Sequence, residues 1–445
     1  FRGQAGAAQA DSIADLPWWS VFQDETLHGL VRTAIANNRD LRVAVARVEL
    51  ARQLAAQERA QYLPQVGYEA GISQGKNEWL GNASATGAGW RGSVIGALQA
   101  SWEADVWGRI RRSNEYALAV FLSTEQGRRG VLLSLVTSVA QAYFELLELD
   151  LRTDIARRSV ESFQGSLNIF QQRLDGGTAS RLETSRAQAA LSSTAAEIPE
   201  LERQIAIKEN EIRVLLGSMP APIDRKGTLL QQGLPPEVPA GLPSSLLERR
   251  PDILEAEANV RAANAQVGIA TAAFFPRIGL TTLLGRASSP LESFTSGQAS
   301  IWSTAANLAG PIYQGGALRA QKRQAIAFWE QTRSAYEQSV LGAFRDVSNA
   351  LISRDKLESI RARQREAVSA YQDAVTVSLQ RYQAGKSSYY EVLEAQQQLF
   401  PAENALARTE LERRLAIVQL YQALGGGWKL SPAEWGGPTP AHPQP

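Results

Sequence analysis

The sequence has 445 residues, and its 46 basic and 45 acidic side chains give a formal net charge of +1. This balance offers no electrostatic case for nucleic-acid binding. Cysteine is absent, which excludes disulfides, thiolate zinc sites and cysteine nucleophiles. The two histidines, His28 and His442, lie far apart in the sequence, so we expect surface positions for them and no metal or cofactor site.

The first part of the chain reads as a short extended segment followed by helices. Phe1 begins the sequence and Met219 is its single methionine, which predicts a processed chain that has lost any signal peptide. A helix is expected from near Asp24. Residues 40–62 contain no glycine or proline and predict a second helix, which ends at Pro64 because proline lacks a backbone donor.

Two stretches then alternate with period two and predict a β-hairpin over residues 65–107. Apolar side chains in the first strand include Val66 and Tyr68, and those in the second include Leu98 and Trp102. A second hairpin is expected over residues 277–312. It has apolar positions from Ile278 to Leu284 and from Trp302 to Ile312.

Long helices follow each hairpin. Residues 109–174 and 316–382 contain no proline, and at about 1.5 Å per residue each would span close to 100 Å as one helix. A further helix is expected after each, ending at Leu216 and Leu424, and Pro199 is expected to interrupt and bend the first of these. The stretch 131–147 is broken by polar residues and predicts no transmembrane helix.

The chain is a duplication. The clearest evidence is the stretch 381–398, in which residue types of the stretch 173–188 recur at a constant spacing along the sequence. The recurring pairs are Arg173/Arg381, Gly177/Gly385, Ser180/Ser388, Glu183/Glu391, Ala187/Ala395 and Gln188/Gln396. Six prolines between Gly217 and Arg250 mark a connector between the two copies.

The four strands could form a soluble sandwich, yet the hairpins lie more than 200 residues apart and one face of each is apolar. An outward apolar face meeting lipid fits this pattern if the sheet closes into a barrel. Four strands cannot enclose a lumen, so subunits must associate. Physical reasoning permits two, three or four subunits.

The sequence resembles the outer membrane factors typified by TolC, and most closely their drug-efflux branch typified by OprM. The stretches that carry this resemblance are NNRDLRVA at 37–44, WEADVWGR at 102–109, RRPDI at 249–253, AFFPRIGL at 273–280, PIYQGG at 311–316 and ALGGGW at 423–428. They run in order along essentially the whole chain. Relatives commonly begin with a lipidated cysteine, which this sequence lacks, so either its start has been trimmed or altered or this member is not lipidated.

The resemblance implies an α+β membrane protein in the outer membrane of a Gram-negative bacterium. A homotrimer would share a twelve-stranded β-barrel, with four strands per chain, which an α-helical barrel continues through the periplasm. A mixed equatorial domain surrounds that helical barrel. The expected divisions are 1–39 (N-terminal segment and equatorial region), 40–217 (first repeat), 218–250 (equatorial connector), 251–424 (second repeat) and 425–445 (equatorial segment and disordered tail).

The same resemblance implies a passive exit duct, not an enzyme, that works with a periplasmic adaptor and an inner-membrane RND-type transporter. In such channels the stretch around Gly385 forms a constricted periplasmic gate, and Tyr390, Glu391 and Glu394 match its lining positions. Glu391 and Glu394 of three chains would place six glutamates around one aperture and favour cations. Each pair of carboxylates at about 8 Å would repel by roughly 2 kcal/mol at a dielectric of 20. An ordinary solvated helix face is the alternative for these carboxylates.

The family's closed-state link between a tyrosine and a carboxylate maps to Tyr382 and Glu183. A second familial link uses an arginine where this chain has Ser387, so Arg181 is a candidate replacement, and Arg186 is a candidate counter-charge for the gate. Gly177 and Gly385 are expected to form the helix turns. A non-pore periplasmic scaffold of long helices remains the alternative function.

Overall fold

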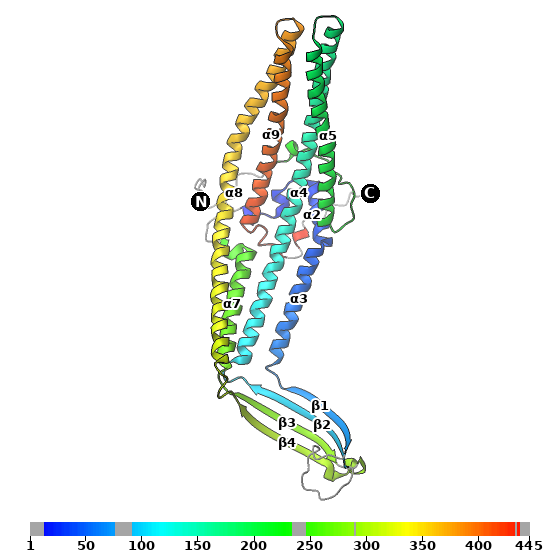
Figure 1. Cartoon of the computed structure of the whole chain (residues 1–445). Coiled ribbons are helices and arrows are strands. Elements are labelled where there is room, and N and C mark those ends of the chain that lie inside the picture. The colour runs from blue at the N-terminus through cyan, green and yellow to red at the C-terminus, as the bar shows by residue number, and fades with distance from the viewer. Residues whose placement is uncertain (1–12, 76–90, 234–245, 289–290, 432–433, 437–445) are drawn as a thin grey trace, which may run out of the picture. The chain divides into compact units, whose positions relative to one another are not determined.

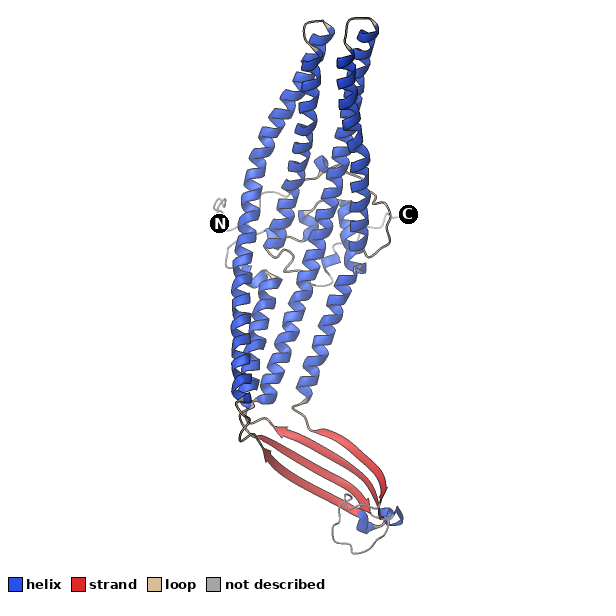
Figure 2. Cartoon of the chain, in the orientation of Figure 1, coloured by secondary structure: helices blue, strands red, loops and turns tan. Residues whose placement is uncertain are grey.

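The computed structural model describes residues 13–75, 91–233, 246–288, 291–431 and 434–436. Figure 2 shows mainly helices in these residues, together with a β-sheet and the connecting loops. The chain divides into two compact units. Unit 1 is Phe1–Val45, Gln126–Leu254 and Gln338–Pro445, and unit 2 is Ala46–Glu125 and Glu255–Glu337. Each unit therefore contains segments from both copies of the duplication.

The elements repeat in order and in length. The helices are α1 (Trp18–Val21), α2 (Glu25–Asn37), α3 (Arg39–Ala60), α4 (Arg109–Asp175), α5 (Arg181–Leu215), α6 (Leu246–Arg249), α7 (Pro251–Ala272), α8 (Ala317–Gln383) and α9 (Tyr389–Ala423). Short 3-10 helices occupy Ile13–Asp15, Leu229–Gln231, Leu291–Thr295, Gly297–Ala299 and Glu434–Gly436. α3 and α7 have 22 residues each, α4 and α8 have 67, and α5 and α9 have 35. These equal lengths confirm the duplication.

The two hairpins form one antiparallel sheet in the order β1-β2-β3-β4. Its strands are β1 (Gln65–Gly75), β2 (Arg91–Ala104), β3 (Arg277–Ser288) and β4 (Ser300–Ala309). The turn expected between β1 and β2 lies outside the described residues. β4 ends at Ala309, so the expectation that Ile312 belongs to this strand was wrong. Ile312 follows Pro311, which cannot donate a ladder hydrogen bond.

One face of the sheet carries a continuous row of exposed apolar side chains. Tyr68 pairs with Leu98, Leu98 with Leu284, and Leu284 with Trp302. These four side chains are 82%, 56%, 60% and 77% exposed. The opposite face carries the row Gln65, Ser101, Thr281 and Ala305. The alternation expected from the sequence is thus realised as an apolar face and a more polar face.

Proline has different consequences at different positions. Pro251 begins α7, where the missing backbone donor costs nothing because the first turn has no partner for it. Pro199 lies inside α5 and Pro401 inside α9, and both helices continue past them. The interruption expected at Pro199 was therefore wrong. Because each helix extends for many residues on both sides, the loss of one backbone hydrogen bond does not end it.

Unit 1 has its main hydrophobic core where distant parts of the chain meet. Trp18, Leu27, Tyr143, Ile212 and Tyr421 are fully buried in it. Within the described residues, α4 is the one helix long and apolar enough by composition to cross a membrane, in a window of mean hydropathy 1.5. This window is 67% buried. Burial in the core of unit 1 accounts for its apolar character.

Candidate functional site: the turns between the long helices

Two tight turns join the long helices, α4 to α5 and α8 to α9 (Figure 1). Gly177 and Gly385 have positive φ angles of 73° and 70°, a conformation that favours glycine. The amide of Thr178 donates to Arg173 O and that of Lys386 to Arg381 O, both at 2.8 Å. These bonds satisfy carbonyls at the helix ends, so the two copies end their long helices in the same way.

The helices that follow the turns begin with the same capping box. Ser180 N donates to Glu183 Oε1, and Ser388 N donates to Glu391 Oε1, both at 3.4 Å. Glu391 therefore has a structural role at the start of α9 that our sequence reading of it as a gate residue missed. The Ser-x-x-Glu spacing in both copies was the signal for it.

Tyr382 is held by three neighbours near the end of α8. Its side chain is 4% exposed, and its hydroxyl donates to Glu183 Oε2 at 3.4 Å. Phe170 packs edge-on against its ring at 5.1 Å. Burial, and then the charge of Glu183, raise the pKa of Tyr382 above its usual 10.0, so its hydroxyl stays a donor at neutral pH. The structure thus brings together the two residues of the expected link.

Arg173 is the third neighbour, and the sequence reading gave it no functional role. Its guanidinium lies over the Tyr382 ring, 4.3 Å from the centroid. Nη2 donates to Tyr382 O at 2.9 Å and to Gln383 O at 3.1 Å, which are carbonyls of the last turn of α8. A cation in this place stabilises the helix end. Its counterpart Arg381 donates to Lys386 O in its own turn.

Two of the three expected gate residues line an open groove between α5 and α9 of about 420 Å³, and Glu391 does not line it. Tyr390, which is 55% exposed, and Glu394 lie on one side of it, and Arg186 lies on the other. In the described part of the chain, Arg186 forms no ion pair with Glu394. Its Nη1 instead donates to the Tyr389 hydroxyl at 3.2 Å.

Arg181 and Ser387 occupy separate places in this region. Arg181 is the exposed first residue of α5, and its carbonyl accepts a hydrogen bond from Thr184. Ser387 Oγ donates to Ser378 O at 3.4 Å. No ion pair involves the Arg181 side chain among the residues that the structure describes. Arg181 as a replacement for the familial arginine link therefore stays a prediction.

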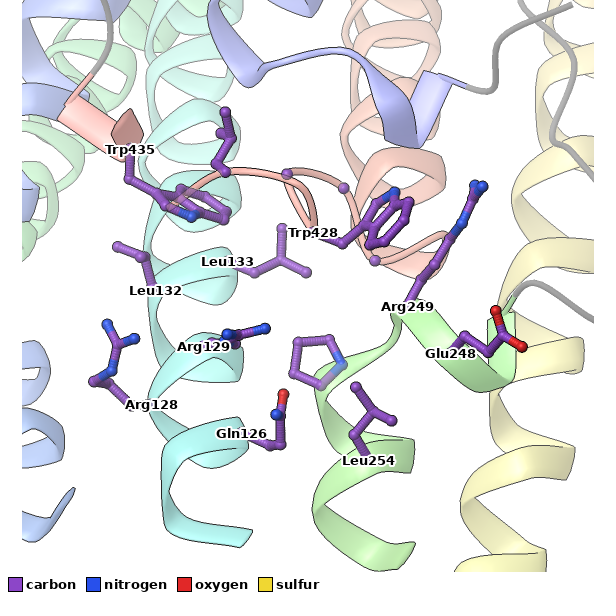
Figure 3. A pocket seen from close by; sticks show the side chains of 15 residues that line it. Gln126, Arg128, Arg129, Leu132, Leu133, Glu248, Arg249, Leu254, Trp428 and Trp435 are labelled. Atoms are coloured by element: carbon purple, nitrogen blue, oxygen red, sulfur yellow. The ribbon is translucent and has the colours of Figure 1, made fainter. Parts of the chain in front are cut away.

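A small cavity in unit 1 lies between α4, the start of α7 and the glycines that follow α9 (Figure 3). Its volume is about 40 Å³. Trp428 lines it, with its ring beside Arg249 at 4.8 Å and Lys429 at 5.4 Å. Sites for drug-sized ligands usually measure about 300–1,000 Å³, so this cavity is far too small for such a substrate.

The described residues contain no group of three or more histidine, cysteine, aspartate or glutamate side chains arranged to hold a metal. The surface position expected for His28 was wrong, because its ring is partly buried against Trp18 and lies 2.5 Å from Phe22 O. Its partial burial follows from its place in α2, three residues before the fully buried Val31 and therefore on the same side of the helix. His442 lies outside the described residues.

Comparison with known proteins identifies the family. The family model "Outer membrane efflux protein" matches residues 30–218 and 242–426. The chain belongs to the outer membrane efflux protein family. The toluene efflux pump outer membrane protein TtgC of Pseudomonas putida is 35% identical over 94% of this chain and 86% of its own length. The cation efflux system protein CusC of Escherichia coli is 34% identical, over 94% and 90% respectively.

A solved structure agrees with this assignment. That of the outer-membrane channel OprN superimposes with a TM-score of 0.87 at 31% identity, covering 96% of this chain and 98% of that one. The resemblance to TolC-type outer membrane factors is therefore confirmed, and so is the α+β channel fold. This outer membrane efflux protein is located in the outer membrane of a Gram-negative bacterium.

Proposed function

We propose that this chain is one subunit of a trimeric outer membrane channel that forms the exit duct of a tripartite efflux pump. The observation that carries the proposal is the exposed apolar row of Tyr68, Leu98, Leu284 and Trp302 across all four strands. A water-exposed sheet face of this kind would promote aggregation, whereas lipid solvates it favourably. Family membership supports the same conclusion.

Closure of the barrel explains why the chain must associate. β1 and β4 are the two edge strands of the sheet, and open edges are not tolerated within a bilayer. Because the four strands alternate in direction, β4 of one copy can pair antiparallel with β1 of the next. Three copies give twelve strands, the number that the family resemblance implies, and the long helices then continue the duct as a helical barrel.

The groove between α5 and α9 supports a role for the turns as the periplasmic gate. Tyr390 and Glu394 line this groove, and Glu391 lies at the start of the same helix. Tyr382 and Glu183 join α8 to α5 at the tips, and we infer that this contact stabilises the closed state. Arg186 keeps one tyrosine of the other hairpin in place and leaves the carboxylates of the gate accessible to cations.

The partners in this proposal are a periplasmic adaptor that opens the gate and an inner-membrane RND-type transporter that supplies the energy. One relative is named for toluene and another for cations, although both are about one third identical to this chain. Such different cargoes fit a shared duct that leaves selection to the transporter. The chain itself conducts passively and catalyses no reaction.

Reconstitution into a planar lipid bilayer tests the channel and its orientation. Leu284→Arg places a charge on the apolar face and is expected to cost about 2–4 kcal/mol near the bilayer midplane, which reduces insertion. The matched control Thr281→Arg places the same charge on the opposite face and should insert normally. Equal insertion of both variants would contradict the lipid-facing assignment. A detergent-extracted oligomer without conductance, even after gate substitutions, would favour a non-pore scaffold.

A further inference from the structure

A buried glutamine joins the two helix hairpins behind the gate. Gln396 of α9 is 5% exposed, and its Nε2 donates to Ser162 Oγ of α4 at 2.8 Å. Ser166, also on α4 and 2% exposed, lies 2.9 Å from Nε2 and donates to Oε1 at 3.2 Å. Both ends of the amide therefore have partners on the opposite helix. A buried amide is costly without partners, so this contact depends on one register of α4 against α9.

The duplication does not repeat this contact. Gln188, the counterpart of Gln396, is exposed and donates to Ser192 in its own helix at 3.1 Å. The residues that stand 208 positions after Ser162 and Ser166 are Ala370 and Ala374, which have no side-chain hydrogen-bonding atoms. The two copies have the same helices, but the side chains that form this hydrogen-bonded contact are present at only one of the two equivalent places.

Apolar clusters surround the glutamine and extend toward the turns. Leu393 packs with Phe163 on one side, and Val392 packs with Phe170 and Tyr382 on the other. Gln396 lies seven residues after the start of α9, or about 10 Å along the helix axis. The polar contact thus directly follows the residues that hold the tips together. Van der Waals contacts tolerate small sliding of two helices, whereas a hydrogen-bonded amide selects one position.

We propose that Gln396, with Ser162 and Ser166, forms a clasp that positions α9 against α4 and stabilises the closed gate. Gln396 acts as a positioning residue, because it sets the place of Tyr390 and Glu394 on the same helix without lining the groove itself. The proposal rests on the channel function proposed above and adds a contact that controls it. Opening then requires the amide to leave its two serine partners.

Single-channel recording of the reconstituted full-length trimer tests the clasp. Gln396→Met keeps the side-chain volume and removes the hydrogen bonds, and each freed serine can bond a carbonyl of its own helix. Losing about one net hydrogen bond raises the ratio of open to closed time roughly fivefold to tenfold per chain, so we expect a rise of roughly 100-fold to 1,000-fold if the three chains open together. The matched control Gln188→Met should leave this ratio unchanged. A second variant, Ser162→Ala with Ser166→Ala, should give a similar rise.

A triple variant, which combines Gln396→Met with Ser162→Ala and Ser166→Ala, decides whether these residues act together. If the clasp is real, Gln396→Met has little further effect in the background that lacks both serines. A full additional effect there would overturn the proposal, as would a lower melting temperature with unchanged open time. A variant that removes the Tyr382–Glu183 contact serves as the reference. If that variant opens the channel and Gln396→Met does not, the clasp fails alone; if no variant ever conducts, the channel function fails as well.

Discussion

The contact between Tyr382 and Glu183 offers the most direct test of the gate. Tyr382→Phe removes the hydroxyl and preserves the ring that packs against Phe170 and under Arg173. For the carboxylate, Glu183→Gln is better than Glu183→Ala, because glutamine also serves in a capping box and keeps the start of α5 intact. The double variant therefore removes the phenol–carboxylate contact with little effect on the helices around it.

The size of the effect follows from the geometry. The hydroxyl lies 3.4 Å from the carboxylate oxygen, longer than a typical O–H···O hydrogen bond of about 2.5–3.0 Å. We therefore assign it the lower part of the usual range, about 0.5–1 kcal/mol per chain. If three chains open together, the closed state loses about 1.5–3 kcal/mol. The ratio of open to closed states then rises about 10-fold to 150-fold.

Planar-bilayer recording measures this ratio as open time and mean conductance. Both should increase in the double variant. Tyr382→Phe alone should give most of the effect, because it removes the donor, whereas Glu183→Gln alone should give less, because its amide oxygen can still accept the hydroxyl hydrogen bond. Tyr371→Phe is the matched control, since it removes a hydroxyl elsewhere on α8, away from Glu183. Unchanged open time in the double variant, with normal trimer assembly, would refute the closed-state role of this contact.

Three further predictions concern charged residues, two near the helix turns and one farther along α9. Glu391→Gln with Glu394→Gln should reduce cation selectivity, measured as a shift in reversal potential, while the cap of α9 survives; unaltered potentials would count against the acidic ring. Arg173→Ala should destabilise the closed arrangement of the helix turns by about 1 kcal/mol and raise open time, whereas Arg381→Ala should have a smaller effect. Equal effects of the two substitutions would contradict the role of Arg173 in capping the end of α8. Burial alone would raise the pKa of Glu410, but hydrogen bonds and charges from nearby arginines outweigh it and lower the pKa below 4.5. Ionised Glu410 therefore stabilises the folded chain above pH 4.5, and this stabilisation is lost as pH falls through the lowered pKa. Glu410→Gln should thus make the melting temperature fall less steeply at acid pH. An unchanged dependence of melting temperature on pH would show that Glu410 contributes nothing there.

Local patterns in the sequence predicted the elements well, because proline stops and side-chain periodicity act over a few residues. The end of α3 near Pro64, the two alternating hairpins and the turn at Gly385 follow from such patterns. Long-range pairing was harder. The contact of Arg186 with Tyr389 depends on the register between helices about 200 residues apart, which no local pattern encodes. Glu391 shows a different difficulty, since one carboxylate fits both a helix cap and a gate.

The two copies differ in the polar contacts that they form with each other, and this difference affects how a ring of such chains opens. Within the chain, Arg173, Tyr382 and Gln396 each join the first hairpin to the second through polar contacts. The reciprocal positions are Arg381, which bonds within its own turn, Leu174, which cannot form such a bond, and the exposed Gln188. In a closed ring the two hairpins alternate, so the reciprocal seam lies between neighbouring chains. Under the proposed function, polar contacts therefore join the two hairpins within each chain. The seam between chains lacks two of the three, because Leu174 and the alanines Ala370 and Ala374 cannot form these bonds, and opening must break the polar set once per subunit.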